Sequence, residues 1–314
     1  MRRVALFAVL FVTVVGARGA GAQDAPADTA GVLVRIELSD GSVFVGTVVR
    51  EDEQQVVLRT RAGAEVAIPT DKIRRREPFA GRVDGDRVIR FDPNRTRLLF
   101  SPTARPLGAG QGYFAVYELF VPFIAGGLTD RVSLAGGTVL LPGAFGRVLY
   151  VAPKVTLVDR PRLAVALGSV GLGVALGDDD DVGAWGTAGI GYGLVTYGGP
   201  ERAVTVGVGF AAVEGEGGSG ALVMLGGETQ VSNAIKLLTE NYVIPYESTT
   251  TVCPFGGPCT STTETEYEVV VSAGIRFFGE QLAADFALWT SPALLDEGAF
   301  PFFPWLGFAY NFGR

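Results

Sequence analysis

Seven charged residues stand inside apolar stretches of the chain after residue 110. They are Glu118, Lys154, Glu228, Lys236, Glu240, Arg276 and Asp285. Bulky apolar residues occupy alternate positions in these stretches, and each charge falls on the opposite face, so we expect all seven to point inward from a β-sheet wall. Four acids and three bases on one inner surface can form an ion-pair network that fills and stiffens the interior, or a constriction that selects solutes by charge. Lys236 and Glu240 share a face and are candidates for one network.

The absence of histidine limits the chemistry of these residues. A chain with no His cannot form a Ser-His or Cys-His catalytic pair or a His-ligated metal site. The acids look scattered along the sequence, and no motif selects two of them for glycoside hydrolysis. Gly189, Gly191 and Gly193 fall within an apolar alternating stretch with no helix after it, which excludes a phosphate loop. The sequence therefore predicts no catalytic residues, no cofactor and no enzyme.

Two polar features fall between the apolar stretches. Cys253 and Cys259 flank a Pro- and Gly-rich turn, and we expect a disulfide because an exported protein meets oxidising conditions. Asp178, Asp179, Asp180 and Asp181 are consecutive acids in a loop. They are a weak candidate for a calcium site, since hard cations bind clustered carboxylates. The favoured interpretation is a solvated loop, because the EF-hand spacing is absent, so no metal site is predicted.

Alternation of two residue classes defines the element that must position the charges. In residues 204–213 and 269–278, Val, Ile and Phe alternate with Gly, Ala, Ser and Thr. A soluble sheet exposes Lys, Glu and Thr, whereas bulky apolar side chains on the outer face indicate contact with lipid. Glycine is 44 of 314 residues, and we expect many glycines on inner faces, where they leave open volume.

Residues 94–314 therefore predict an all-β fold, an antiparallel transmembrane β-barrel of about 12 strands, with 10 as the next choice. Short polar turns alternate along this region with longer connections, which places the turns on the periplasmic side. The count of 12 uses residues 95–103 as the first strand and 105–112 as the first external loop.

Residues 1–22 predict a secretory signal peptide. Arg2 and Arg3 precede an apolar run, and Ala20-Gly21-Ala22 fits a cleavage site; the alternative is an uncleaved anchor. Cleavage removes three of the 26 basic residues and none of the 33 acidic ones, so the formal net charge falls from −7 to −10. An acidic exported protein is a poor nucleic-acid binder. Residues 23–30 form a short linker.

Residues 31–76 predict a small periplasmic β module, followed by a linker or extra hairpin over 77–93. Short alternating runs turn at Asp40-Gly41 and Ala62-Gly63, and closure of such short strands would remove exposed edges. The run LVRIELSDGSVFVGTVV and its continuation VVLRTRAGAEVAIPTDKI resemble Sm-like and SH3-like small barrels. The sequence names no ligand or partner for this module.

The large region resembles bacterial outer-membrane β-barrel proteins. The ending PWLGFAYNFGR is similar to their C-terminal insertion signal, which here would be Phe308, Tyr310 and Phe312, although Gly313 and Arg314 follow it. The resemblance implies outer-membrane lipid and the barrel-insertion machinery as partners. From this we expect a non-enzymatic passive channel or structural membrane protein with a polar lumen. A secreted or surface β-rich binding or adhesion protein is the alternative, and an outer-membrane hydrolase is less favoured.

Overall fold

The computed structural model describes residues 33–60, 62–84, 87–142, 146–176, 184–213, 221–253, 259–296 and 301–313. The predicted signal peptide, the 23–30 linker and the four acids at 178–181 lie outside these residues. In the part of the chain that is described, no helix is long and apolar enough to cross a membrane.

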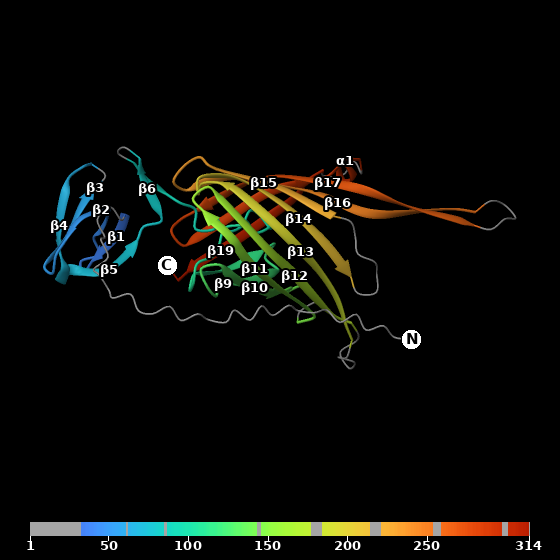
Figure 1. Cartoon of the computed structure of the whole chain (residues 1–314), viewed down its shortest axis with the longest axis horizontal. Helices are drawn as coiled ribbons and strands as arrows, with labels where there is room; N and C mark the ends of the chain where they lie inside the picture. The colour runs from blue at the N-terminus through green and yellow to red at the C-terminus, as the bar shows by residue number, and fades with distance from the viewer. Residues whose placement is uncertain are drawn as a thin grey trace.

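A five-stranded antiparallel sheet lies at the N-terminal side of the described chain (Figure 1). Its order is β4-β3-β2-β1-β5, with β1 (Leu33–Leu38), β2 (Val43–Glu51), β3 (Gln55–Thr60), β4 (Glu65–Pro69) and β5 (Ile73–Pro78). A 3₁₀ turn, Thr70–Lys72, joins the last two strands. Alternate residues of β1, among them Val34 and Ile36, are buried with Leu58 and Ile68 in the core of this sheet. Strand β5 contains Arg74, Arg75 and Arg76, which form ion pairs with glutamates of the same sheet.

A two-stranded hairpin connects this sheet to the large region. It consists of β6 (Gly81–Asp84) and β7 (Arg87–Arg90). The hairpin contacts the nearest barrel turns: Arg82 pairs with Glu201 at 2.5 Å, and Asn233 Nδ2 donates to the carbonyl of Val88 at 2.8 Å. These contacts place the N-terminal strands at the end of the barrel that has the short turns.

Twelve antiparallel strands of the described chain close into a barrel, which confirms the predicted fold class and strand number. Closure occurs where β19 pairs with β8, from Gly307↔Tyr117 to Phe312↔Gly112. A short helix, α1 (Pro292–Asp296), precedes β19. The strands are β8 (Gly112–Tyr117), β9 (Val121–Gly127), β10 (Val132–Thr138), β11 (Val148–Arg160), β12 (Leu163–Leu176), β13 (Ala184–Gly198), β14 (Arg202–Val213), β15 (Ala221–Gln230), β16 (Ile235–Val252), β17 (Thr260–Phe278), β18 (Leu282–Thr290) and β19 (Phe303–Phe312).

The barrel wall has an apolar outer face. On β14, Val204, Val206, Val208 and Phe210 are exposed, whereas Thr205, on the opposite face, is buried. On β19, Phe308, Tyr310 and Phe312 are exposed and alternate with inward residues. Bulky apolar side chains outside and small or polar ones inside are the arrangement of an outer-membrane β-barrel, because lipid replaces water as the outer solvent.

The strands differ in length around the barrel. Strands β8, β9 and β10 have only six or seven residues, whereas β16 and β17 have 18 and 19. The β16–β17 hairpin therefore extends well past the wall at the end opposite the N-terminal sheet (Figure 1). Cys253 and Cys259 form a disulfide directly beyond its last pair, Val252↔Thr260, as predicted.

The predicted first strand, residues 95–103, is wrong, and so is the predicted external loop at 105–112. Residues 92–107, called the plug below, fold inside the barrel. The Asp92 side chain accepts from the Asn94 backbone N–H at 2.8 Å, and Leu98 N–H donates to the Ser101 carbonyl at 2.8 Å. These turns bend the chain every few residues, so it cannot extend along the wall. The twelfth strand comes instead from residues 112–127, which form the β8–β9 hairpin.

Candidate functional site

The plug is bound by charged and polar side chains from much of the barrel wall. Its groups hydrogen-bond to inward residues of β11, β13, β15, β16, β17, β18 and β19. Because inward positions alternate with lipid-facing ones, each strand contributes these contacts at a period of two. The predicted inward charges of the strands thus meet a segment that lies far from them in sequence.

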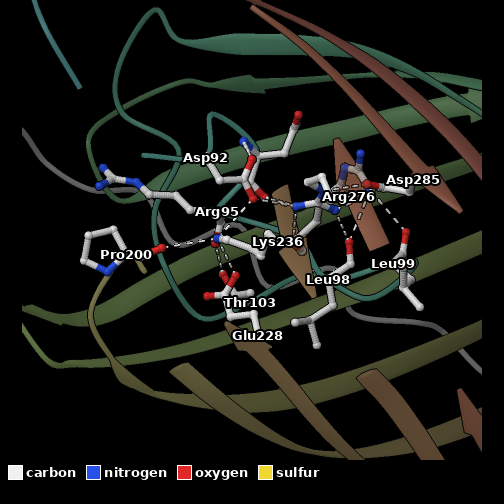
Figure 2. Close-up of polar contacts among 12 residues, drawn as sticks. Asp92, Arg95, Leu98, Leu99, Thr103, Pro200, Glu228, Lys236, Arg276 and Asp285 are labelled. Atoms are coloured by element: carbon white, nitrogen blue, oxygen red, sulfur yellow. Dashed lines mark hydrogen bonds and ion pairs between the residues drawn. The ribbon is translucent and has the colours of Figure 1, made fainter. Parts of the chain in front are cut away.

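Lys236 links two parts of this network, which Figure 2 shows in close-up. Its ammonium nitrogen is 2.9 Å from Glu228 Oε2, 3.1 Å from Asp92 Oδ2 and 3.2 Å from the Pro200 carbonyl. Burial raises the pKa of the Asp92 carboxyl, but Arg276 and Lys236 outweigh this effect, so the pKa lies below the ordinary 3.8.

Arg276 and Asp285 form the centre of the network. The Arg276 Nε is 2.5 Å from Asp285 Oδ1, and its Nη1 is 2.9 Å from Asp92 Oδ2. Arg276 Nη2 donates to the Leu98 carbonyl at 2.6 Å. Arg97 of the plug reaches the same aspartate from the other side, with Nη1 2.5 Å from Asp285 Oδ2. One carboxylate therefore binds two guanidinium groups in a water-excluded interior, where each bond is charge-assisted.

Two further bases connect the plug to the wall. Arg105 pairs with Glu228, and its Nη2 donates to the Gly199 carbonyl at 2.7 Å. Lys154 of β11 donates to the carbonyls of Thr103 and Arg105, each at 2.8 Å. Among the described residues Lys154 has no carboxylate partner, although its side chain is buried.

Glu240 holds the tip of the plug. Its carboxylate accepts from the backbone N–H groups of Leu99, Phe100 and Ser101 at 2.9, 3.0 and 2.9 Å. It also bonds Tyr242, whose hydroxyl is 2.6 Å from Ser101 Oγ. The negative charge of Glu240 is thus stabilised by hydrogen bonds from three backbone N–H groups rather than by an ion pair with a basic side chain.

Inward glycines make room for the plug rather than for open space. A Cβ at Gly226 would lie 2.1 Å from Leu98 Cδ1, and one at Gly274 would lie 3.0 Å from Leu99 Cδ2. Leu98 and Leu99 are fully buried. The expectation that inward glycine leaves open volume is therefore wrong at these two positions, because the plug fills it.

Two adjoining apolar pockets occupy the lumen beyond the plug. The tyrosine pocket, of about 500 Å³, is lined by Tyr113, Tyr117, Tyr150, Tyr192, Arg97, Lys154 and apolar neighbours. The tryptophan pocket, of about 540 Å³, is lined by Trp289, Trp305, Tyr242, Met224, Leu194 and Ser101 among others. Phe100 of the plug, Pro102 and Tyr192 border both. Pockets of this size and lining are typical of small-molecule sites.

Several polar atoms at these pockets have no hydrogen-bond partner. They are Nε and Nη2 of Arg97 and Oγ1 of Thr96, two residues that line the tyrosine pocket, and Nε1 of Trp289 and Trp305, which line the tryptophan pocket. Buried donors are nearly always satisfied in folded proteins. These unpaired donors lie on residues that line the pockets, which makes the two pockets candidates for binding a ligand with a polar group.

Six of the seven predicted charges converge on the plug: Lys154, Glu228, Lys236, Glu240, Arg276 and Asp285. Glu118 does not. It lies in the turn between β8 and β9 with a positive φ of 48° and accepts from the Leu306 N–H at 2.7 Å. Sequence reasoning missed Asp92, Arg97 and Arg105, whose only signal is a group of charges between apolar residues ahead of the barrel. No group of His, Cys, Asp or Glu in the described chain is arranged to hold a metal ion.

Comparisons with known proteins add little to this geometry. No family model and no curated protein matches the chain. Among solved structures, OmpT, an outer-membrane protein of Vibrio cholerae, shares 10% identity at a TM-score of 0.34, over 90% of this chain and 95% of that one. Its loop L8 deletion mutant gives 10% and 0.34, over 89% and 96%. With such low scores, the assignment as an outer-membrane β-barrel rests on this chain's own strand pairing and apolar outer wall.

The prediction of a non-enzymatic passive channel or structural barrel with a polar lumen requires correction. The plug fills the part of the lumen that contains the charges, and the pockets beyond it have apolar walls. The exclusion of an enzyme rested on the absence of His and on acids that look scattered in the sequence. The structure gathers Glu228, Glu240 and Asp285 around one segment, so the argument from scattered acids is wrong.

Proposed function

We propose that this outer-membrane barrel binds the apolar chain of a lipid-like molecule in its lumen. The observation that carries the proposal is the pair of adjoining aromatic-lined pockets on the far side of the plug. Burial of apolar surface stabilises a complex by roughly 25 cal/mol per Å² removed from water. Transfer of an apolar chain from water into these pockets is therefore favourable. A channel for polar solutes needs a wet, polar path, which these walls do not offer.

The placement of the chain in the cell is part of the proposal. We infer export by a signal peptide at residues 1–22, insertion by the barrel-insertion machinery through Phe308, Tyr310 and Phe312, and a periplasmic N-terminal sheet. The ion pair between Arg82 and Glu201 supports the last point, because it joins this part of the chain to the short-turn end of the barrel. The strand order β4-β3-β2-β1-β5 supports an Sm-like or SH3-like relationship.

A matched pair of variants tests ligand binding. Ala152 of β11 lines the tyrosine pocket, whereas its neighbour Val151 is 49% exposed on the lipid face. We expect a pyrene-labelled long-chain alcohol to bind the purified barrel in amphipol. Ala152→Trp should weaken binding by about tenfold or more because it fills the pocket, while Val151→Trp should leave it unchanged. Equal affinity in all three proteins would contradict the proposal, provided each shows heat-modifiable migration on a detergent gel.

A second candidate function is hydrolysis of an ester in the bound lipid. One observation favours it: Ser101 Oγ is 2.6 Å from the Tyr242 hydroxyl, which in turn bonds the Glu240 carboxylate, at the wall of the tryptophan pocket. Ser101 Oγ would attack the ester carbonyl carbon as its proton passes to Tyr242 and the proton of Tyr242 passes to Glu240. The C–O bond to the alcohol then breaks, the alcohol leaves with a proton returned along the same path, and water hydrolyses the acyl-enzyme to release the acid.

The hydrolase candidate is tested with a long-chain p-nitrophenyl ester. Turnover that disappears in Ser101→Ala, while binding of the uncharged pyrene alcohol persists, would support catalysis. If the wild-type protein and Ser101→Ala hydrolyse the ester at the same rate, Ser101 is not the nucleophile.

A further inference from the structure

We propose that Arg97 and Lys154 bind the anionic oxygen head of an amphiphile whose chain lies in the tyrosine pocket, an inference that rests on the proposed function. Both side chains line that pocket and are buried, Arg97 being only 1% exposed and Lys154 6%. The expected ligand is a long-chain carboxylate or an alkyl phosphate, two molecules that share this head chemistry.

The unused edge of the Arg97 guanidinium is the first observation. Nη1 is fully occupied, by Asp285 at 2.5 Å and by the Leu98 and Leu99 carbonyls at 3.2 Å. Nε and Nη2, whose N–H bonds point in the same direction along one edge, are buried without a hydrogen-bond partner. This edge is the one that binds carboxylate or phosphate oxygens in bidentate fashion. Arg97 is also held in place by the Tyr117 ring, whose centroid is 5.6 Å from Cζ.

The charge balance around the plug is the second observation. The buried acids of the network in the described chain are Asp92, Glu228, Glu240 and Asp285, and the buried bases are Arg97, Arg105, Lys154, Lys236 and Arg276. The bases exceed the acids by one. Lys154 is the member that meets only carbonyl oxygens, from Thr103 and Arg105. Burial of an uncompensated cation is costly, so one anionic head in the pocket would neutralise the excess.

The walls of the pocket supply the third observation. Apart from Arg97, Lys154, Thr96 and Ser133, the lining is apolar and aromatic, with Phe123, Tyr150 and Leu172 among its members. A cationic end and an apolar body together match an amphiphile with a single anionic head. A wholly apolar molecule would leave the Arg97 edge unpaired, and a polar solute would leave the aromatic walls unmatched.

Displacement of the pyrene alcohol by four competitors tests the inference. The competitors are hexadecanoate, hexadecyl phosphate, hexadecanol and hexadecylammonium, added to the barrel in amphipol. We expect hexadecanoate or hexadecyl phosphate to displace the probe at concentrations about tenfold lower than hexadecanol, and hexadecylammonium to be weaker than hexadecanol. The stronger of the two anions identifies the head as carboxylate or phosphate.

Conservative variants separate the head site from the fold. Arg97→Lys keeps the charge and a donor for Asp285 but loses the bidentate edge, so it should lose the preference for the anion while hexadecanol still competes. Lys154→Gln should reduce the same preference, and Arg202→Lys, an exposed control on β14, should not. Equal competition by hexadecanoate, hexadecyl phosphate and hexadecanol in the wild-type protein would overturn the anionic-head inference alone. A barrel that binds neither the probe nor any competitor would overturn the proposed function as well.

Discussion

Arg276 on β17 and Asp285 on β18 lie side by side on the inner face of the barrel wall and form a fully buried ion pair. They are register partners, their side chains are 0% exposed, and Nε lies 2.5 Å from Oδ1. Asp285 also binds Arg97, and Arg276 also binds Asp92. The pair therefore connects two neighbouring strands to two points of the plug, its first residue Asp92 and Arg97.

Replacing Asp285 with Asn should destabilise the barrel by about 3–5 kcal/mol, because two guanidinium groups would stay buried with too little negative charge. The measurement is urea unfolding in lipid vesicles, followed by tryptophan fluorescence. Glu201→Gln is the control. It weakens the partly exposed pair with Arg82 and should cost about 1 kcal/mol or less. A loss no larger than that of the control would show that the buried pair contributes little.

Replacing Gly226 with Val should destabilise the barrel by about 1–3 kcal/mol, since the new side chain overlaps Leu98 of the plug. Leu98→Ala alone removes buried contacts and should cost about 2–5 kcal/mol. In the double variant the loss should be smaller than the sum, because the smaller residue at position 98 relieves the overlap. Gly191→Ala, with no atom within 4 Å of the added Cβ, is the control for altered strand propensity. If the stability losses of Gly226→Val and Leu98→Ala add up in the double variant, Gly226 does not make room for Leu98.

Removal of the plug should open the barrel to ions. The intact chain should give no steady conductance in a planar bilayer, because residues 92–107 are tied to seven strands of the wall. Replacement of residues 94–105 by a Gly-Ser segment of the same length should produce a lasting current. If both proteins conduct equally, the plug does not close the lumen.

Asp92 should contribute to stability at neutral pH and lose that contribution in acid. Its folded-state pKa is held below 3.8 by Arg276 and Lys236, against the opposing effect of burial. As the pH falls below about 4, the unfolded chain takes up the proton first, and the contribution disappears as the pH approaches the folded-state pKa. The difference in unfolding free energy between the wild-type protein and Asp92→Asn should be constant from about pH 7 to 5 and shrink below about pH 4. A difference that grows in acid would contradict this assignment.

The amino-acid sequence by itself determined the wall of this protein. Val204, Val206, Val208 and Phe210 alternate with small residues, and in a strand that alternation specifies which side chains meet lipid and which face inward. The same rule placed Lys236, Arg276 and Asp285 in the interior, and the Pro- and Gly-rich sequence between Cys253 and Cys259 predicted their disulfide.

Only the tertiary structure decided what fills the interior. Leu98 and Leu99 are adjacent and both fully buried, which no strand with two distinct faces allows, so periodicity could not identify the plug as a separate element. Alternation specifies the direction of a side chain but not its partner across the lumen. The contacts of Asp285 with Arg97, Glu240 with the plug N–H groups and Gly226 with Leu98 join residues more than a hundred positions apart. They form because barrel closure brings inward faces of many strands around one short segment, which converts scattered charges into a single network and leaves apolar pockets beyond it.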